Sequence, residues 1–280
     1  MSTPHRYSQP ALRRPRKLQL AANAGVAPGA GSGIGIHGVE VVQAIQSVDN
    51  SVRLIADKPA VVRLYLNPDG IASASLVTGE LTWRRDGGGM TYLPAMNRVK
   101  VTPTKRPTLD EQRFDIDLSI NFRLPQEALK AGELELFVRR LSVPGGADIP
   151  IATPVQFKVR FHSAPVLRVR AIGLRYKSLT TPGTFVSPEA IHFMYLKSYL
   201  QRAYPVAAVE WSQLVVDADL IAPPFPANAS DLANAQLSAL RAREISSGVD
   251  PRTHYYGLVD NDRGKKGSFM RGSAAYDLKR

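Results

Sequence analysis

Alternation of apolar and polar residues with a period of two runs through most of residues 36–161 and restricts this part of the chain to β-strands. The stretch FDIDLSINF, residues 114–122, shows the pattern over its whole length. Its apolar side chains fall on one face (Phe114, Ile116, Leu118 and Ile120), and its polar side chains fall on the other (Asp115, Asp117, Ser119 and Asn121). The pattern predicts an antiparallel strand with one buried face.

Further strands are predicted along the same part of the chain, with turns between them. We expect them in VVRLYL, ELTW, ELELFV and VQFKVRF, which begin at residues 61, 80, 133 and 155. The turns are marked by NPDG (67–70), DGGG (86–89) and VPGG (143–146). LPQEALKAG (124–132) is expected to be a crossing loop with one helical turn. About seven strands in roughly 125 residues predict an all-β, immunoglobulin-like sandwich over residues 36–162.

Beyond residue 165 the pattern changes to alternating strands and helices. VLRVRAIGLRY (166–176) is expected to be a strand. A helix should follow and run to about residue 202, because Ser187 can cap it, Pro188 suits its first position and Glu189 complements its dipole.

Three more elements are expected after this helix. They are a strand near residues 209–216, a helix that opens at Ser230 or Asp231 and closes near Gly248, and a strand at residues 253–259. The alternation predicts an α/β layer over residues 165–280, and the layer is incomplete where the sequence stops.

The glycine run GAGSGIG (29–35) is similar to the phosphate-binding turn of short-chain dehydrogenases. That turn needs a buried strand before it and a helix after it. Here AANAGVAP (21–28) precedes the run, and β-branched residues typical of a strand follow it. No tyrosine has a lysine four residues later, as those enzymes require. We therefore expect a linker at the end of a disordered basic leader, residues 1–35, and keep a nicotinamide cofactor only as a third hypothesis.

The net charge of +12 is concentrated at the two ends of the chain. Residues 1–39 hold five arginines or lysines and no acid, and residues 263–280 hold six against one aspartate, so residues 40–262 carry only +2. Basic ends without a recognised binding motif predict solvated tails and no specific nucleic-acid partner. The sequence has no cysteine, which excludes disulfides and thiolate chemistry.

The compartment stays open between secreted and cytoplasmic. RRPRK (13–17) and the apolar residues after it are only distantly similar to a twin-arginine export signal, because the apolar segment is short and Pro15 interrupts the basic cluster. No stretch approaches the roughly 20 apolar residues that a membrane-spanning helix needs.

The sequence offers few groups for chemistry. The five histidines are His5, His37, His162, His192 and His254; no pair has the spacing of a zinc site on a helix, and HExxH is absent. DNDRG (260–264) lacks the distal ligands of a calcium loop, so a solvated turn is expected. Asp217 and Asp219 are interpreted as the polar face of a strand end. Five aromatic residues are expected to be core or half-buried: Trp83, Trp211, Phe193, Tyr195 and Tyr199.

Two segments carry a family resemblance. VEVVQAIQSVDNSVRLIADKPAVVRLYL (39–66) resembles the opening of the non-catalytic β-domain in large bacterial proteins with a zinc metallopeptidase domain. HYYGLVDNDRGKKGSFMRGSAAY (254–276) resembles the strand and glycine-rich loop that lead to the HExxH helix of those proteins. RVRAIGLRYK (168–177) and YPV (204–206) fit the same pattern. The resemblance implies an immunoglobulin-like domain followed by the N-terminal half of a zincin-like domain.

The resemblance places no catalytic or metal-binding residue in this chain, because the sequence stops before the HExxH helix. Gly267, Met270 and Gly272 would at most line the wall over which a substrate passes. Zinc is expected only if the chain continued into such a helix. The implied function is the non-catalytic front portion of a truncated metallopeptidase-like protein. The alternative hypothesis is a β-sandwich that binds or adheres to a protein or a polysaccharide, an analogy of fold and not of a site.

Overall fold

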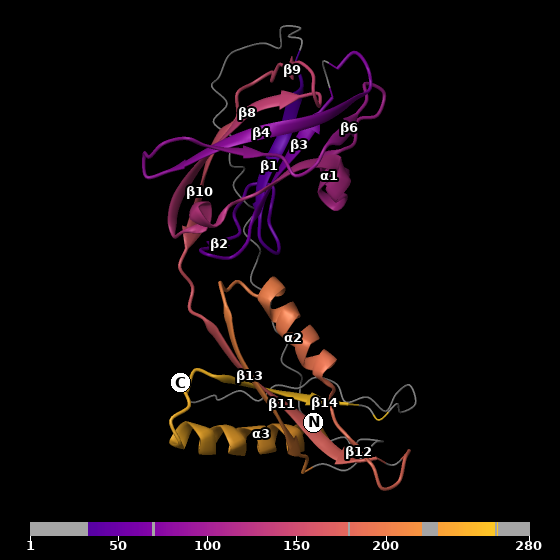
Figure 1. Cartoon of the computed structure of the whole chain (residues 1–280), viewed down its shortest axis with the longest axis vertical. Coiled ribbons are helices and arrows are strands. Elements are labelled where there is room, and N and C mark those ends of the chain that lie inside the picture. Colours follow the sequence, from indigo (N-terminus) through magenta and orange to yellow (C-terminus); the bar gives the residue numbers. More distant parts are fainter. Residues whose placement is uncertain (1–32, 69–70, 179, 220–228, 261, 263–280) are drawn as a thin grey trace, which may run out of the picture.

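The computed structural model of the chain describes residues 33–68, 71–178, 180–219, 229–260 and 262. The fold is rich in β-sheet and has two parts, which we call the β region (residues 33–162) and the α/β region (residues 165–262) (Figure 1). None of the described helices is both long enough and apolar enough to cross a bilayer.

The β region consists of two sheets. In the smaller sheet, β3 (Val61–Asn67) pairs antiparallel with both β1 (Gly35–Val42) and β7 (Ser119–Arg123). The larger sheet has five strands in the order β2 (Leu54–Ile55), β10 (Gln156–His162), β8 (Gly132–Ser142), β4 (Ser75–Arg85) and β5 (Thr91–Pro94). Two short strands extend it: β6 (Val99–Val101) pairs with β4, and β9 (Asp148–Ile149) pairs with β8.

One apolar core joins the two sheets. Leu64 of β3 and Phe122 of β7 belong to it from the smaller sheet, and Leu81 of β4 and Leu136 of β8 belong to it from the larger one. All four side chains are fully buried. The 3-10 turn η2 (Gln126–Leu129) adds Leu129, so the predicted helical turn in residues 124–132 is confirmed. The four strands predicted at residues 61, 80, 133 and 155 are confirmed as parts of β3, β4, β8 and β10.

The stretch with the strongest alternation is only partly a strand. Residues 114–118 were expected in the strand, but they belong to the end of helix α1 (Leu109–Phe114) and to the 3-10 turn η1 (Ile116–Leu118), and β7 begins at Ser119. Phe114 is 98% exposed. A capping box explains the difference, because Thr108 accepts from the backbone of Glu111 and Glu111 accepts from the backbone of Thr108. This local signal overrides the alternation.

The glycine run also extends into the β region. Its residues 29–32 lie outside the described part of the chain, but Ile34 is fully buried and forms a parallel bridge with Ile151, and β1 begins at Gly35. Gly33 approaches the Pro150 oxygen so closely that a Cβ would lie 2.8 Å from it. The end of the run therefore serves close backbone packing, and the expected boundary at residue 35 lies about two residues too late.

The α/β region is built around one central strand, β11 (Leu167–Lys177). It pairs in parallel with β13 (Val209–Asp217) along one edge and with β14 (His254–Val259) along the other. The short β12 (Phe185–Val186) pairs antiparallel with the end of β11. All three longer strands match the predicted ones.

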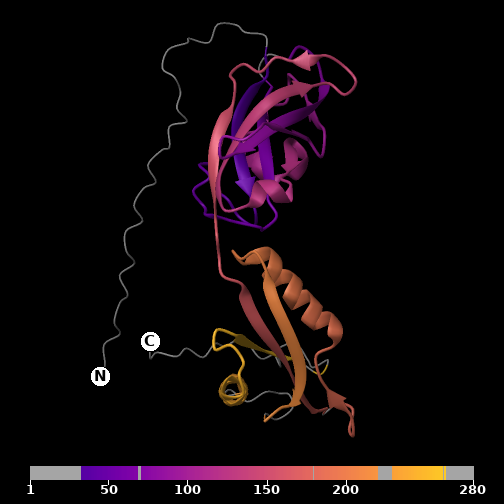
Figure 2. The same ribbon diagram turned by 60° about the vertical axis from the view of Figure 1, so that its left-hand side comes forward.

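Two helices lie on opposite faces of this sheet (Figure 2). A Cβ on Gly173 would lie 2.9 Å from Phe193 of α2 (Ala190–Ala203), so the absence of a side chain lets this helix approach the strand. The next residue back, Ile172, points to the other face and packs with Leu237 of α3 (Ala229–Ser246). Helix α3 ends in a Schellman motif at Gly248, whose φ is +103°, as predicted.

Helix α2 begins later than its sequence suggested. Its N-cap is Glu189, and Ser187 and Pro188 precede it. The backbone N–H of Glu189 donates to Nδ1 of His192 at 3.0 Å. This contact gives His192 a structural role at the helix start.

Lys58 links the two regions. Lys58 of the β region is 3% exposed, and its ammonium donates to the carbonyl oxygens of Gln201 and Arg202, at 2.7 and 3.1 Å, at the C-terminal end of α2. Burial lowers the pKa of Lys58. A cation at this end of a helix is favourable because the unpaired carbonyls carry partial negative charge.

Candidate functional site

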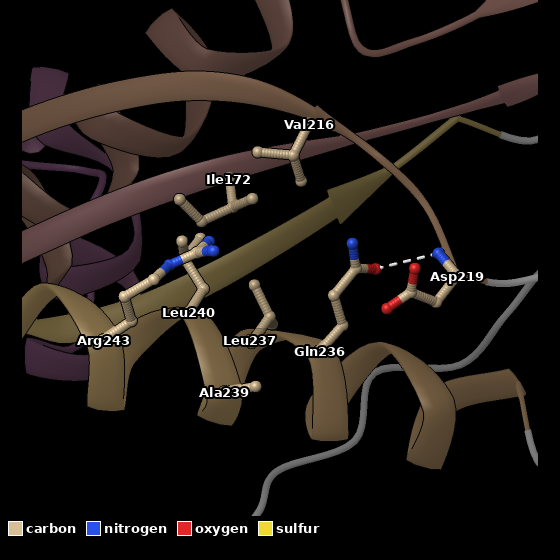
Figure 3. Close-up of a pocket in the computed structure, with 8 residues that line it drawn as sticks. All are labelled: Ile172, Val216, Asp219, Gln236, Leu237, Ala239, Leu240 and Arg243. Carbon is tan, nitrogen blue, oxygen red and sulfur yellow. Dashed lines mark hydrogen bonds between the residues drawn. The ribbon is translucent and has the colours of Figure 1, made fainter.

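The candidate site is a groove of about 270 Å³ between helix α3 and strands β11 and β13, which we call the α3 groove (Figure 3). Helix α3 packs on β14 and the neighbouring part of β11, and it leaves part of β13 uncovered. The groove is lined by Ile172, Val216, Asp219, Gln236, Leu237, Ala239, Leu240 and Arg243. Its floor is therefore apolar, and its three polar side chains lie at the rim.

Gln236 fixes the end of β13 against the helix. Its amide nitrogen donates to the carbonyl of Asp217 at 2.6 Å, and its amide oxygen accepts from the N–H of Asp219 at 3.0 Å. Figure 3 shows this contact at one end of the groove, with the Asp219 carboxylate beside it. Because both ends of the Gln236 amide are engaged, Asp219 is held at a defined position along α3.

A second polar contact fixes the C-terminal end of α3. The guanidinium of Arg170 in β11 contacts both carboxylate oxygens of Glu244, each at 2.7 Å, and the Tyr255 hydroxyl in β14 donates to the same carboxylate. The hydrogen bond from Arg170 lowers the pKa of Glu244. Burial, with the Glu244 contact, raises the pKa of Tyr255 to about 12. The helix that forms one wall of the groove is thus attached to the sheet at its middle and near its C-terminal end.

The charges of the groove lie at its two ends. Asp219 stands beside Gln236, and Arg243 stands two turns further along α3 (Figure 3). Within the described part of the chain, neither the Asp219 carboxylate nor the Arg243 guanidinium makes a hydrogen bond or an ion pair. The arrangement offers an apolar floor between one negative and one positive group. This arrangement suits a ligand with an apolar body and opposite charges at its ends.

A second polar cluster lies at the carboxyl ends of β11 and β14. The carboxylate of Asp262, which is 7% exposed, accepts hydrogen bonds from the hydroxyls of Ser178 and Thr180 at 2.8 to 3.0 Å. The solvated turn expected at residues 260–264 is therefore wrong for Asp262, which is packed and has a φ of +53°. The cluster joins the loop that follows β11 to a residue that follows β14.

The β region has a polar cavity of about 400 Å³, which we call the β cavity. It lies beside β4, β8 and the loops that follow β5 and β8, and it is lined by Thr78, Ala95, Met96, Asn97, Arg98, Arg140, Ser142, Pro144 and Gly145. Arg140 is 3.2 Å from Asp148 and 3.5 Å from Glu80. The cavity offers two guanidinium groups and several hydroxyl and amide groups, which suit an anionic or hydroxyl-rich ligand.

The residues expected to line a substrate wall, Gly267, Met270 and Gly272, lie outside the described residues. Among the residues that the structure does describe, no three or more His, Cys, Asp or Glu side chains come together in a group that could hold a metal ion.

Two of the aromatic expectations are wrong. Phe193 and Trp83 are buried and Trp211 is half-buried, but Tyr195 and Tyr199 are 64% and 57% exposed on the outer face of α2. The sequence also missed the contact between the backbone of Asp219 and Gln236 of α3. Gln236 was the available signal, since a polar side chain between Ala233 and Leu237 on the buried side of a helix needs a partner.

Neither any protein-family model nor any curated protein matches this chain.

Proposed function

We propose that this chain forms the non-catalytic front portion of a metallopeptidase-like protein and has no peptidase activity by itself. The proposal rests on the segment resemblances of residues 39–66 and 254–276. The HExxH helix that such enzymes need does not occur in the sequence.

One observation carries the proposal. Residues 39–66 cover most of β1 together with β2 and β3 in the β region, and residues 254–259 form β14 in the α/β region. The strand that would lead toward a catalytic helix is thus the final described strand of a parallel sheet with helices on both faces. A strand at residues 254–259 supports this part of the resemblance.

Two experiments test this proposal. Purified protein of these 280 residues is incubated with a mixture of internally quenched peptides and with excess zinc, and no hydrolysis is expected. Hydrolysis that a chelator abolishes would contradict the proposal. Sequencing the coding DNA beyond the codon for Arg280, with translation in three frames, tests the origin: an HExxH helix supports it, and its absence from all frames contradicts it.

The β cavity favours a second candidate function, binding of a polysaccharide partner by the β region. Two arginines beside hydroxyl and amide groups suit an anionic polysaccharide. Retention on an anionic polysaccharide resin at high salt is expected to fall in Arg98→Gln and Arg140→Gln. Arg160→Gln, an exposed arginine on β10 outside the cavity, is the matched control. Equal retention of all three variants would mean that binding depends only on general electrostatic attraction and not on the β cavity.

A further inference from the structure

We propose that the α3 groove binds a short apolar peptide of about three residues with both termini free. Its N-terminal ammonium would lie at Asp219 and its C-terminal carboxylate at Arg243. This binding does not depend on peptidase activity, and it uses only residues of the α/β region.

The floor selects an apolar ligand. Ile172 and Leu240 are at most 9% exposed, and Val216 is half-buried, so these side chains form a continuous apolar surface under the groove. A volume of about 270 Å³ accommodates a small molecule and excludes a folded partner. Burying apolar side chains on this floor supplies the attraction.

The rim selects a ligand with opposite charges at its ends. The Gln236 contact holds Asp219 at the level of residue 236, and Arg243 is seven residues further along α3. Seven residues of helix span about 10 Å at the usual rise per residue. An extended peptide covers about 3.3 to 3.6 Å per residue, so three residues match this separation. Both side chains are exposed, and neither forms a hydrogen bond or an ion pair among the described residues, so both can reach a ligand.

The Gln236 amide contributes rigidity and not recognition. Its nitrogen and its oxygen each already make a hydrogen bond to the backbone of residues 217–219. Discrimination between ligands therefore depends on the two ends. A peptide with blocked ends should lose both ion pairs and keep its apolar contacts.

The experiment measures binding of Ala-Leu-Ala by calorimetry and by methyl chemical shifts. Signals of Ile172, Val216 and Leu240 should shift on titration. The N-acetylated, C-amidated peptide should bind about tenfold more weakly, because two surface ion pairs are lost. Undetectable binding of Ala-Leu-Ala at millimolar concentration, equal affinity for the blocked peptide, or methyl shifts confined to other parts of the molecule would each overturn the proposal.

Charge variants test the direction of binding. Asp219→Asn and Arg243→Gln should each weaken binding of the free peptide about threefold and leave the blocked peptide unaffected. Both side chains are exposed, so these variants should keep the fold. The exchanged variant Asp219→Arg with Arg243→Asp should recover the affinity with the peptide reversed, and a spin label at the peptide N-terminus would detect the reversal. Arg202→Gln on α2, on the other face of the sheet, is the control. A loss in the control equal to that in Arg243→Gln would contradict the assignment.

Discussion

The β region and the α/β region differ in how completely each buries its own apolar residues. The core of the β region contains 24 buried residues contributed by two sheets. Among the residues that the structure describes, the main core of the α/β region contains six, between one face of a three-stranded parallel layer and α3. Both regions use central strands of similar length, since β4, β8 and β11 each have 11 residues. The difference therefore comes from what covers the strands.

How completely the strands are covered affects both the stability of each region and its ability to bind a ligand. Strands β4 and β8 each pair on both sides, and the second sheet covers their buried face. In the α/β region β13 and β14 each have one pairing partner among the described strands, and α3 leaves the α3 groove open beside β13. Segments with few buried contacts open at lower free energy than the rest of a protein. The groove that can bind a ligand thus lies in the region that we expect to be less stable.

The largest loss of stability is expected from a matched pair of leucine substitutions, one in the core of each region. Leu64→Ala in β3 removes a fully buried side chain and should lower the free energy of unfolding of the β region by about 4 kcal/mol, because the two packed sheets cannot collapse around the cavity. Leu240→Ala in α3 lies at the edge of the open groove. It should lower the free energy of unfolding of the α/β region by about 2 kcal/mol. Urea unfolding measures both. A larger loss for Leu240→Ala would contradict the comparison.

Close packing of α2 on the sheet is tested at Gly173. Gly173→Ala places a Cβ 2.9 Å from Phe193 and 3.2 Å from Val215, and should destabilise the α/β region by about 1 to 3 kcal/mol through overpacking. Gly89→Ala is the control, because a Cβ there meets nothing within 4 Å and should leave the β region unchanged. Thermal unfolding compares the two variants. Equal midpoints would show that α2 is not packed as described.

The link between the regions is tested at Lys58. Lys58→Met removes both hydrogen bonds to the end of α2 and should cost about 1 kcal/mol. It should also broaden the distribution of distances between the regions. The chain has no cysteine, so spin labels at Thr91→Cys and Ser238→Cys report this distance directly. Lys130→Met, which loses only an exposed contact with Asp57, should leave the distribution narrow. An unchanged distribution in Lys58→Met would exclude the link.

The smallest predicted effect is a dependence on pH at Glu244. Contact with Arg170 lowers the pKa of this carboxyl in the folded state below its ordinary value of 4.5. The stabilisation is therefore present above pH 4.5 and is lost as the pH falls through the folded value. Glu244→Gln should lower the free energy of unfolding of the α/β region by about 1 kcal/mol at pH 7. It should also reduce the fall of this free energy between pH 4.5 and more acidic pH. An unchanged fall in this free energy would mean that the pair contributes nothing.

The sequence predicted most strands and both long helices because their signals are local. Period-two alternation identified β3, β4, β8 and β10, and Gly248 marked the end of α3. The sequence-based predictions failed where two local signals compete, or where the contact partner of a residue is distant in the sequence. The Thr108–Glu111 capping box overrode alternation at residues 114–118. The α3 groove depends on Asp219 and Arg243, which are 24 positions apart, so only the fold of β13 against α3 brings them into one site.

We expect the two regions to unfold separately, with the α/β region first. The sequence has two tryptophans, Trp83 in β4 and Trp211 in β13, so fluorine-labelled tryptophan gives one resonance for each region. Trp83→Phe and Trp211→Phe assign the two signals. In a urea titration of the unaltered chain we predict that the Trp211 signal changes at a clearly lower urea concentration than the Trp83 signal. Coincident transitions would mean one cooperative unit and would contradict the account.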